Sequence, residues 1–309
     1  MARFVSSFGQ VACKMQSVTV RVPASTSNLG PGFDCLGVAL RIYNYVTVSR
    51  GRRAGRDSMA LEAAKFFFES AKLKPFAWSC SITGDVPPCR GLGSSVTVRL
   101  GVLHGLNALA GRPLNRDQIF EMCAEMEGHP DNAAPAEFGG FNVVRGIERQ
   151  KFGVATGLRF VLLIPAFGIA TNQARKILPP RINRARAVES CGNACAITAA
   201  FAARNYEKLR GAFRDHFHQP FREKLIPFLN SVIEAGEEAG ALGGFLSGSG
   251  STIACLSLRS PEKVATAMIR VAGPNARSLI TTADNGGTRV LPFRNPKFEI
   301  RSRSHASLA

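Results

Sequence analysis

A glycine-rich segment at residues 86–95, VPPCRGLGSS, has the residue types that bind phosphate. It lies between a predicted strand and the start of a predicted helix. Glycine lets the backbone approach a ligand closely, and the free N–H groups and positive dipole end of a helix start favour phosphate oxygens. The hydroxyls of Ser94 and Ser95 can bind phosphate or Mg²⁺. A plain strand-to-helix turn with a serine N-cap would use the same residues. The segment has neither a Walker A ending nor a G-x-G-x-x-G pattern.

Two further glycine-rich segments carry polar side chains. Residues 23–37, PASTSNLGPGFDCLG, place Asn28 and Asp34 on a loop after a predicted strand. Residues 246–251, LSGSGS, join two strand-like pieces. Each segment alone also fits a structural role, because Asn and Asp commonly form Asx turns and a Gly/Ser run can form a flexible hairpin.

A dense polar cluster lies between these segments, at residues 125–132, EMEGHPDN. Glu125 and Glu127 stand at the end of a predicted helix, and His129, Asp131 and Asn132 follow. Carboxylate oxygens suit Mg²⁺, whereas zinc would need further Cys or His ligands that are not close in the sequence. The cluster therefore favours a magnesium site over a zinc site.

Hydrophobic periodicity predicts the elements that position these segments. We expect strands at residues 18–22, 42–48, 77–83, 160–164 and 252–258, and helices at 61–73, 94–110, 115–127, 184–205, 206–213, 222–239 and from Pro261 onward. Pro23 is expected to end the first strand. Because strands and helices do not alternate as regular βαβ units, the pattern predicts an α+β fold. A polar, basic stretch near residue 150 predicts the boundary between two domains, at 17–155 and 156–291. We expect an extension (1–16) before them and a basic tail (292–309) after them.

The composition narrows the class of protein. The chain has 309 residues, of which 45% are hydrophobic and 20% charged, a balance that excludes general disorder. Lys and Arg number 39 against 22 Asp and Glu, and this net charge of +17 suggests nucleic acid, an acidic membrane or a phosphorylated ligand as partner. No apolar run reaches the ~20 residues of a membrane span, and no secretory signal is evident. The eight cysteines form no Cys-x-x-Cys pair, so we expect reduced, mostly buried thiols and a cytoplasmic location.

Taken together and in this order, the four segments resemble the GHMP kinases and, within that superfamily, the homoserine kinase family. Residues 22–40 and 127–141 carry the resemblance to homoserine kinases. Residues 87–95 are similar to the ATP loop of the superfamily, and residues 246–251 to its third glycine motif. The resemblance implies an N-terminal domain like ribosomal protein S5 domain 2 and a ferredoxin-like C-terminal domain. It also implies phosphorylation of the L-homoserine hydroxyl in threonine biosynthesis, with ATP and Mg²⁺, by a homodimer.

The resemblance further implies roles for individual residues. The expected ATP-binding residues are Pro87, Arg90, Gly91, Leu92, Gly93, Ser94 and Ser95. Mg²⁺ would be held by Ser95 and Glu127, with Glu125 as the alternative carboxylate. Homoserine would contact Asn28, Asp34, His129, Asp131, Asn132, Thr171, Arg175, Arg222 and Gly248, of which Asp34, Asn132 and Arg175 are expected to be catalytic. Asp34 suits the ammonium group, and an arginine suits the carboxylate.

Phosphoryl transfer depends on in-line positioning and charge neutralisation more than on proton abstraction. We therefore expect direct transfer without an essential base, with Asp34 and then His129 as rival bases. One alternative is a kinase for another small hydroxylated metabolite. Another is a non-catalytic, nucleic-acid-associated protein of the same fold, although one Trp and three Tyr offer few stacking platforms for bases. The short 49–77 region, with its Arg50–Arg56 cluster, leaves the adenine contacts open.

Overall fold

The computed structural model describes residues 15–51 and 57–292. Most of the expected N-terminal extension, the Arg50–Arg56 cluster and the basic tail lie outside the described residues. The strands are β1 (Ser17–Ser27), β2 (Leu36–Arg50), β3 (Trp78–Gly84), β4 (Phe141–Arg145), β5 (Glu148–Phe152), β6 (Arg159–Pro165), β7 (Gly243–Leu246), β8 (Ile253–Ser257), β9 (Ala276–Thr281) and β10 (Arg289–Val290). The α-helices are α1 (Ser58–Ser70), α2 (Ser94–Leu109), α3 (Arg116–Glu127), α4 (Ala133–Phe138), α5 (Thr171–Lys176), α6 (Arg184–Ala202), α7 (Gln219–Arg222), α8 (Leu229–Glu238) and α9 (Pro261–Ala272). Two 3₁₀ turns are η1 (Tyr206–Leu209) and η2 (Glu223–Leu225).

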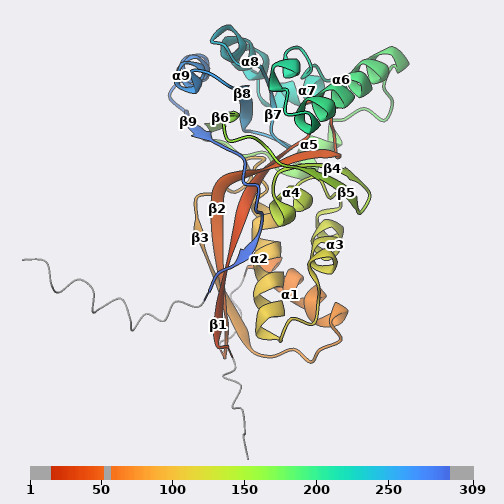
Figure 1. Ribbon diagram of the computed structural model, residues 1–309, viewed down its shortest axis with the longest axis vertical. Helices are drawn as coiled ribbons and strands as arrows, with labels where there is room; N and C mark the ends of the chain where they lie inside the picture. Colours follow the sequence, from red (N-terminus) through yellow and green to blue (C-terminus); the bar gives the residue numbers. More distant parts are fainter. Residues whose placement is uncertain (1–14, 52–56, 293–309) are drawn as a thin grey trace, which may run out of the picture.

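The first sheet is built around the long strands β1 and β2 (Figure 1). Its order is β10-β1-β2-β4-β5, and β3 also pairs with β2. Because β2 has 15 residues, its C-terminal half pairs with β3 while its N-terminal end, Leu36–Val38, pairs with β4. Alternate residues of β1 from Val18 to Val22 are buried, as expected for a strand with one face on a core. Helices α1, α2 and α3 cover that face (Figure 1).

The second sheet has four antiparallel strands in the order β7-β8-β6-β9. Numbered along the chain as strands one to four, this order is 4-1-3-2 when read from β9. Helices lie between β6 and β7 and between β8 and β9, which gives the βαββαβ connectivity of a ferredoxin-like fold. Helices α8 and α9 pack on one face of this sheet. The predicted α+β class is therefore confirmed.

Helix α2 packs directly against the first sheet and is buried on most sides. Gly101 and Gly105 face Val46 and Val48 of β2, where any Cβ atom would collide with the valine side chains. These glycines lie four residues apart, on one face of the helix, and so allow close approach to the sheet. The close packing fixes the N-terminus of α2, which carries the predicted phosphate-binding loop.

The two sheets share one hydrophobic cluster. Phe141 of β4 lies in the same cluster as Phe160 of β6 and Phe245 of β7. The ring of Phe141 also stacks on Phe201 of α6, with centroids 4.3 Å apart. In addition β10, which the expected division places in the second domain, pairs with β1 of the first sheet. The end of the chain therefore returns to the first sheet, beyond the expected division at residue 155.

Several predicted element boundaries are wrong for identifiable reasons. β1 does not end at Pro23 but continues to Ser27 through a bulge between Pro23 and Ala24. A bulge accommodates proline because the ladder is already interrupted there. The helix predicted at 206–213 is only the turn η1, and that predicted at 222–239 is divided into α7, η2 and α8. Pro227 lies at the break before α8, where a proline disfavours helical backbone in the residue before it.

The cysteines are less buried than expected. All seven within the described residues are free, but only Cys123 and Cys255 are buried. Cys89, Cys191 and Cys195 are exposed. The prediction of mostly buried thiols was therefore wrong.

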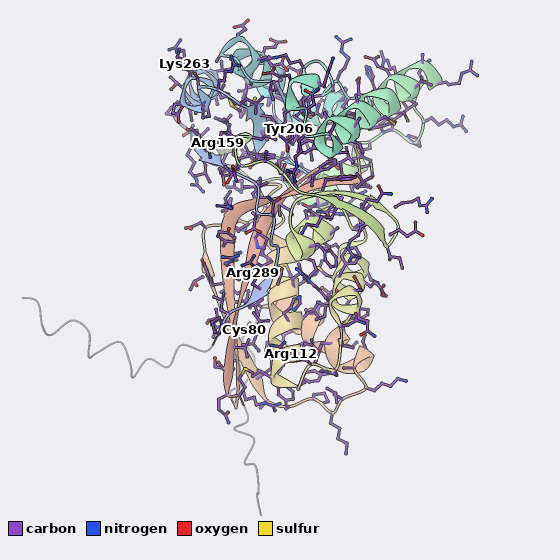
Figure 2. The ribbon with its side chains drawn as sticks, in the orientation of Figure 1. Cys80, Arg112, Arg159, Tyr206, Lys263 and Arg289 are labelled. Carbon is purple, nitrogen blue, oxygen red and sulfur yellow. The ribbon has the colours of Figure 1, made fainter. Side chains whose placement is uncertain are left out.

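Positively charged side chains are distributed over several elements. Arg112 follows α2, Arg159 begins β6, Lys263 lies on α9 and Arg289 on β10, and all four are exposed (Figure 2). These four charges therefore come from separate elements rather than from one segment. Among the described residues, no helix has the length and apolar character needed to cross a bilayer.

Candidate active site

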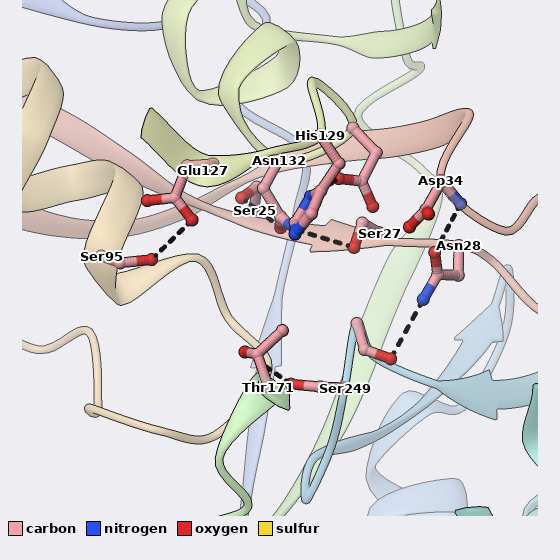
Figure 3. A network of polar contacts seen from close by, with 12 residues as sticks. Ser25, Ser27, Asn28, Asp34, Ser95, Glu127, His129, Asn132, Thr171 and Ser249 are labelled. Carbon is pink, nitrogen blue, oxygen red and sulfur yellow. Dashed lines mark hydrogen bonds and ion pairs between the residues drawn. The ribbon is translucent and has the colours of Figure 1, made fainter. Parts of the chain in front are cut away.

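The predicted motifs meet in one cleft, lined from both parts of the molecule (Figure 3). The loop after β1, the start of α2 and residues 127–132 form one side. Thr171 and Arg175 of α5, Arg222 of α7 and the loop after β7 form the other. A hydrogen bond joins the loop after β1 to the loop after β7, more than 200 residues away in the sequence. In it, Asn28 Nδ2 donates to the carbonyl of Gly248 at 3.0 Å.

The loop before α2 has left-handed backbone at two glycines, a conformation that glycine adopts without steric cost. Gly91 and Gly93 have φ angles of 69° and 68°, and Gly93 is the N-cap of α2. A Cβ atom at Gly91 would collide with the carbonyl oxygen of Ser247, and one at Gly93 with Ser25 Oγ. Because the N-cap is a glycine, no side chain there accepts from the first N–H groups of α2. This end of the helix can therefore bind phosphate oxygens.

Ser95 and Glu127 form an oxygen-rich pair at the start of α2. Ser95 Oγ donates to Glu127 Oε2 at 3.0 Å, as Figure 3 shows. The other carboxylate oxygen accepts from Arg99 Nη1 at 2.6 Å, and Arg99 also pairs with Glu62 at 2.9 Å. A hydroxyl and an oriented carboxylate are the hard oxygen donors that Mg²⁺ prefers. Glu125, the alternative ligand, is exposed and does not line the cleft.

Asp34 and Arg175 form a bidentate ion pair across the cleft. Arg175 Nη2 donates to Asp34 Oδ1 at 2.7 Å, and Nη1 donates to Oδ2 at 3.0 Å. Asp34 has a φ of 58° and Asn28 a φ of 71°, which are uncommon for residues with a side chain. The Asn28 side chain supports this backbone, because its Oδ1 accepts from the Asp34 N–H at 3.0 Å. Strained backbone held in place by its surroundings is typical of functional sites.

Asn132 and His129 complete the polar floor of the cleft. Asn132 Oδ1 accepts from Ser25 Oγ and its Nδ2 donates to Ser27 Oγ, both at 2.9 Å, which fixes the amide orientation. His129 Nδ1 lies 2.6 Å from Asp131 Oδ1. Burial opposes the charged form of His129, but the hydrogen bond and the charge of Asp131 outweigh it, and the pKa of His129 is raised.

The structure brings Asp34 close to His129 and Asp131, which the resemblance assigns to the same substrate. Potential ligand atoms of Asp34, His129 and Asp131 lie within 4.8 Å of one another. This part of the cleft therefore holds two carboxylates and an imidazole, and Arg175 and Arg222 line the same cleft.

Arg222 is a cation buried at the base of the cleft, only 2% exposed. Burial, together with the charge of Arg175, lowers the pKa of Arg222 to about 10. Nearer the opening, Thr171 Oγ1 lies 3.4 Å from Ser249 Oγ (Figure 3). A buried guanidinium is a strong site for an anionic group, since its charge is poorly screened by water.

Most of the predicted site residues line this one cleft. They are Asn28, Asp34, Arg90, Gly91, Gly93, Ser94, Ser95, Glu127, His129, Asp131, Asn132, Thr171, Arg175, Arg222 and Gly248. Pro87, Leu92 and Glu125 do not line it, and Leu92 is a fully buried core residue. Among the lining residues that the sequence did not assign to the site are Phe33, Met59 and Ser249. Phe33 and Ser249 lie within the glycine-rich segments at residues 23–37 and 246–251, whereas nothing in the pattern around Met59 indicates a site.

Two family models match the chain. The model described as GHMP kinases N terminal domain matches residues 58–140, and that described as GHMP kinases C terminal matches residues 197–273. Together these matches span the start of α2, the polar cluster and the loop after β7.

Individual proteins are similar over most of the chain. A homoserine kinase from Clostridium beijerinckii is 36% identical over 293 residues, which cover 89% of this chain and 98% of the relative. The crystal structure of a homoserine kinase from Cytophaga hutchinsonii is 26% identical with a TM-score of 0.82, covering 94% of this chain and all of that one. The mevalonate kinase of Methanococcus jannaschii, with 14% identity, 89% and 98% coverage and a TM-score of 0.67, shares the fold. The chain therefore belongs to the GHMP kinases and, within them, to the homoserine kinase family.

Proposed function

We propose that this chain transfers the γ-phosphoryl group of ATP to the side-chain hydroxyl of L-homoserine and so acts in threonine biosynthesis. One observation carries the proposal. The N-terminus of α2, which follows a glycine-rich loop and suits phosphate, lies in the same cleft as the Asp34 carboxylate and the two arginines Arg175 and Arg222. That combination fits a nucleotide next to a small zwitterion.

The Asp34–Arg175 pair matches the two charged ends of an amino acid. In the structure each partner neutralises the other. A bound homoserine would bring its own ammonium to Asp34 and its carboxylate to Arg175 and Arg222. The half-exposed ion pair is thereby replaced without leaving either charge unpaired. A substrate without both charges, such as mevalonate, would leave part of this set unmatched.

The residues at the start of α2 suit the triphosphate. Gly91, Gly93 and Ser94 would contact phosphate oxygens, and Ser95 with Glu127 would hold Mg²⁺. When bound, Mg²⁺ neutralises phosphate charge. Arg99 keeps the Glu127 carboxylate oriented by its hydrogen bond to Oε1. Asn132, with its amide fixed between two serines, would orient the hydroxyl of homoserine toward the phosphate.

The contacts of Asp34 favour transfer without an essential base. Both of its carboxylate oxygens accept hydrogen bonds from Arg175, a contact that suits the binding of a charged group. The Nδ1 atom of His129, the second candidate base, faces Asp131. We therefore assign Asp34 to binding, and assign catalysis to positioning and charge neutralisation.

A coupled assay of ADP release tests the function. Homoserine, serine, threonine and mevalonate are compared as acceptors, with and without Mg²⁺. Only homoserine with Mg²⁺ is expected to give rapid ADP release, and mass spectrometry of the product should show the phosphorylated amino acid. Absence of homoserine-dependent ADP would refute the proposal, and a preference for another acceptor would support a related GHMP kinase.

A further inference from the structure

His218 is a fully buried histidine that none of the motifs identified. It precedes α7, has 0% exposure and lies between the loop after β1 and the side chain of Arg222. Its ring stacks on Phe33, with centroids 5.2 Å apart and planes inclined by 29°. The guanidinium groups of Arg175 and Arg222 each lie 5.4 Å from the centre of the Phe33 ring. His218 is therefore one contact away from the substrate side of the cleft.

The partners of the two ring nitrogens define the form of His218. Nε2 lies 2.8 Å from the carbonyl oxygen of Gly30, which can only accept, so Nε2 carries the hydrogen. Nδ1 lies 3.1 Å from Arg222 Nη1, which can only donate, so Nδ1 accepts. The imidazole is thus neutral. Burial lowers the pKa of His218 to about 4 and outweighs the opposing charge of Asp215, while the charge of Arg222 acts in the same direction as burial.

The neighbouring carboxylate does not disturb this arrangement. Asp215 Oδ2 lies 3.4 Å from His218 Nε2. The Asp215 side chain already accepts from the backbone N–H groups of Phe217, His218 and Gln219, at 2.7, 3.0 and 2.8 Å. Its negative charge is therefore stabilised by the turn that begins α7.

The hydrogen bonds of Arg222 leave one nitrogen for a ligand. Nη1 donates to the carbonyl of Gly248 at 2.9 Å and to His218, and Nε donates to the carbonyl of Ala174 at 3.2 Å. Within residues 15–51 and 57–292, Nη2 makes no hydrogen bond, and Arg222 lines the cleft. Three contacts therefore hold the guanidinium plane and direct the two N–H groups of Nη2 to whatever occupies the cleft.

We propose that His218 is a positioning residue for the amino-acid substrate, whose Nδ1 lone pair fixes Arg222 so that Nη2 meets the carboxylate. This inference rests on the proposed function, since it assigns the homoserine carboxylate to Arg222. The histidine supplies an acceptor to a buried arginine without adding a charge that would compete with the substrate. An aspartate here would pair with Arg222 and weaken its attraction for an incoming carboxylate.

Two half-mimics of histidine separate the roles of its nitrogens. In His218→Asn, the amide oxygen takes the place of Nδ1 as acceptor, but the contact to Gly30 is lost. In His218→Gln, the amide nitrogen takes the place of Nε2 as donor, but Arg222 loses its acceptor. We expect His218→Asn to keep the homoserine KM within about 3-fold of wild type, and His218→Gln to raise it about 10- to 100-fold. The ATP KM should be unchanged in both.

Matched controls and outcomes follow from the same chain. His216, two residues away, pairs with Glu189 at 2.9 Å and does not line the cleft, so His216→Asn and His216→Gln should leave both KM values unchanged. Equal homoserine KM values for the two His218 variants, or parallel changes in the ATP KM, would overturn the inference. If the wild-type chain gives no homoserine-dependent ADP, the proposed function itself fails, and the two failures are thereby distinguished.

A measurement on the wild-type chain does not depend on the folding of variants. The ¹⁵N shifts of the histidine side chains, with His218 assigned by comparison with a variant that folds or by through-bond correlation, report the tautomer. At neutral pH we expect an Nε2–H imidazole with an unprotonated Nδ1 that accepts from Arg222. An Nδ1–H tautomer or an imidazolium would remove the acceptor and overturn the inference.

Discussion

At the scale of residues, a substitution in the bidentate ion pair between Asp34 and Arg175 distinguishes a binding role for Asp34 from a role as catalytic base. In Asp34→Asn the side chain keeps its shape but loses the charge that would attract the ammonium of homoserine. We expect the homoserine KM to rise about 10- to 100-fold while kcat at saturating homoserine stays within about 3-fold of wild type. Steady-state kinetics with homoserine varied at saturating ATP measures both values.

A control pair lies outside the cleft. Asp117 accepts from Arg149 at 2.7 Å on the surface, so Asp117→Asn removes a comparable ion pair without touching the site. That variant should show unchanged kinetics, because exposed pairs contribute little. A collapse of kcat in Asp34→Asn at saturating homoserine would instead identify Asp34 as the base.

The two carboxylates at the end of α3 give a second residue-level prediction. Glu127 faces Ser95 in the cleft, whereas Glu125 is exposed, although they differ by only two positions. Glu127→Gln should lower kcat about 100-fold or more and raise the Mg²⁺ concentration needed for half-maximal rate. Glu125→Gln should change neither quantity measurably. A Mg²⁺ titration of ADP release checks both variants, and the reverse pattern would transfer the metal site to Glu125.

The residue-level predictions from sequence succeeded where a motif carried them. Asn28, Asp34 and Asn132 lie in runs whose residue order resembles a family, and all three line the cleft. Met59 lines it too, but it belongs to a helix whose pattern indicates only packing. The role of His218 depends on partners at Gly30 and Arg222, and no local pattern reveals a contact across 188 residues.

At the scale of elements, the start of α2 depends on glycine backbone. Gly93 and Gly111 flank α2 and both have positive φ, at 68° and 88°. Alanine at either position costs about 1 kcal/mol of stability from backbone strain. Only at Gly93 does the new methyl group also collide, with Ser25 Oγ, whereas Gly111 has open space around it. Gly93→Ala is therefore expected to raise the ATP KM about 10-fold or more, while Gly111→Ala affects stability alone.

Kinetics and thermal unfolding of the two variants measure these effects. Because Gly111 carries the same strain without the collision, it separates loss of the phosphate-binding shape from loss of stability. Equal ATP KM values for the two variants would show that the loop before α2 does not hold the triphosphate.

Element prediction failed mainly where tertiary contacts override a local signal. Pro23 is a sound stop signal for an isolated strand, but β2 pairs with both sides of the bulge and extends the ladder to Ser27. The capping box of α3, by contrast, is a local interaction that Asn115 and Gln118 form with each other. Local hydrogen bonding can be predicted from adjacent residues, whereas the extension of β1 requires a partner strand.

At the scale of the whole molecule, the shared hydrophobic cluster predicts that both sheets unfold together. Phe141 is fully buried, stacks on Phe201 of α6 and lies in one cluster with Phe160 and Phe245 of the second sheet. Phe141→Ala should lower the free energy of unfolding by about 3–5 kcal/mol, through lost burial and the cavity that remains. Val188→Ala, at a side chain that is 66% exposed, should change it by less than about 0.5 kcal/mol.

Two probes test whether the transition is single. Trp78, the one tryptophan of the chain, lies in β3 and reports on the first sheet by fluorescence. Amide hydrogen exchange of β6 and β9 reports on the second. Because β10 also returns to β1 from the end of the second sheet, we expect the two probes to give the same denaturant midpoint, and Phe141→Ala to shift both equally. Separate midpoints, with Phe141→Ala moving only that of Trp78, would instead support two independently folding domains divided near residue 155.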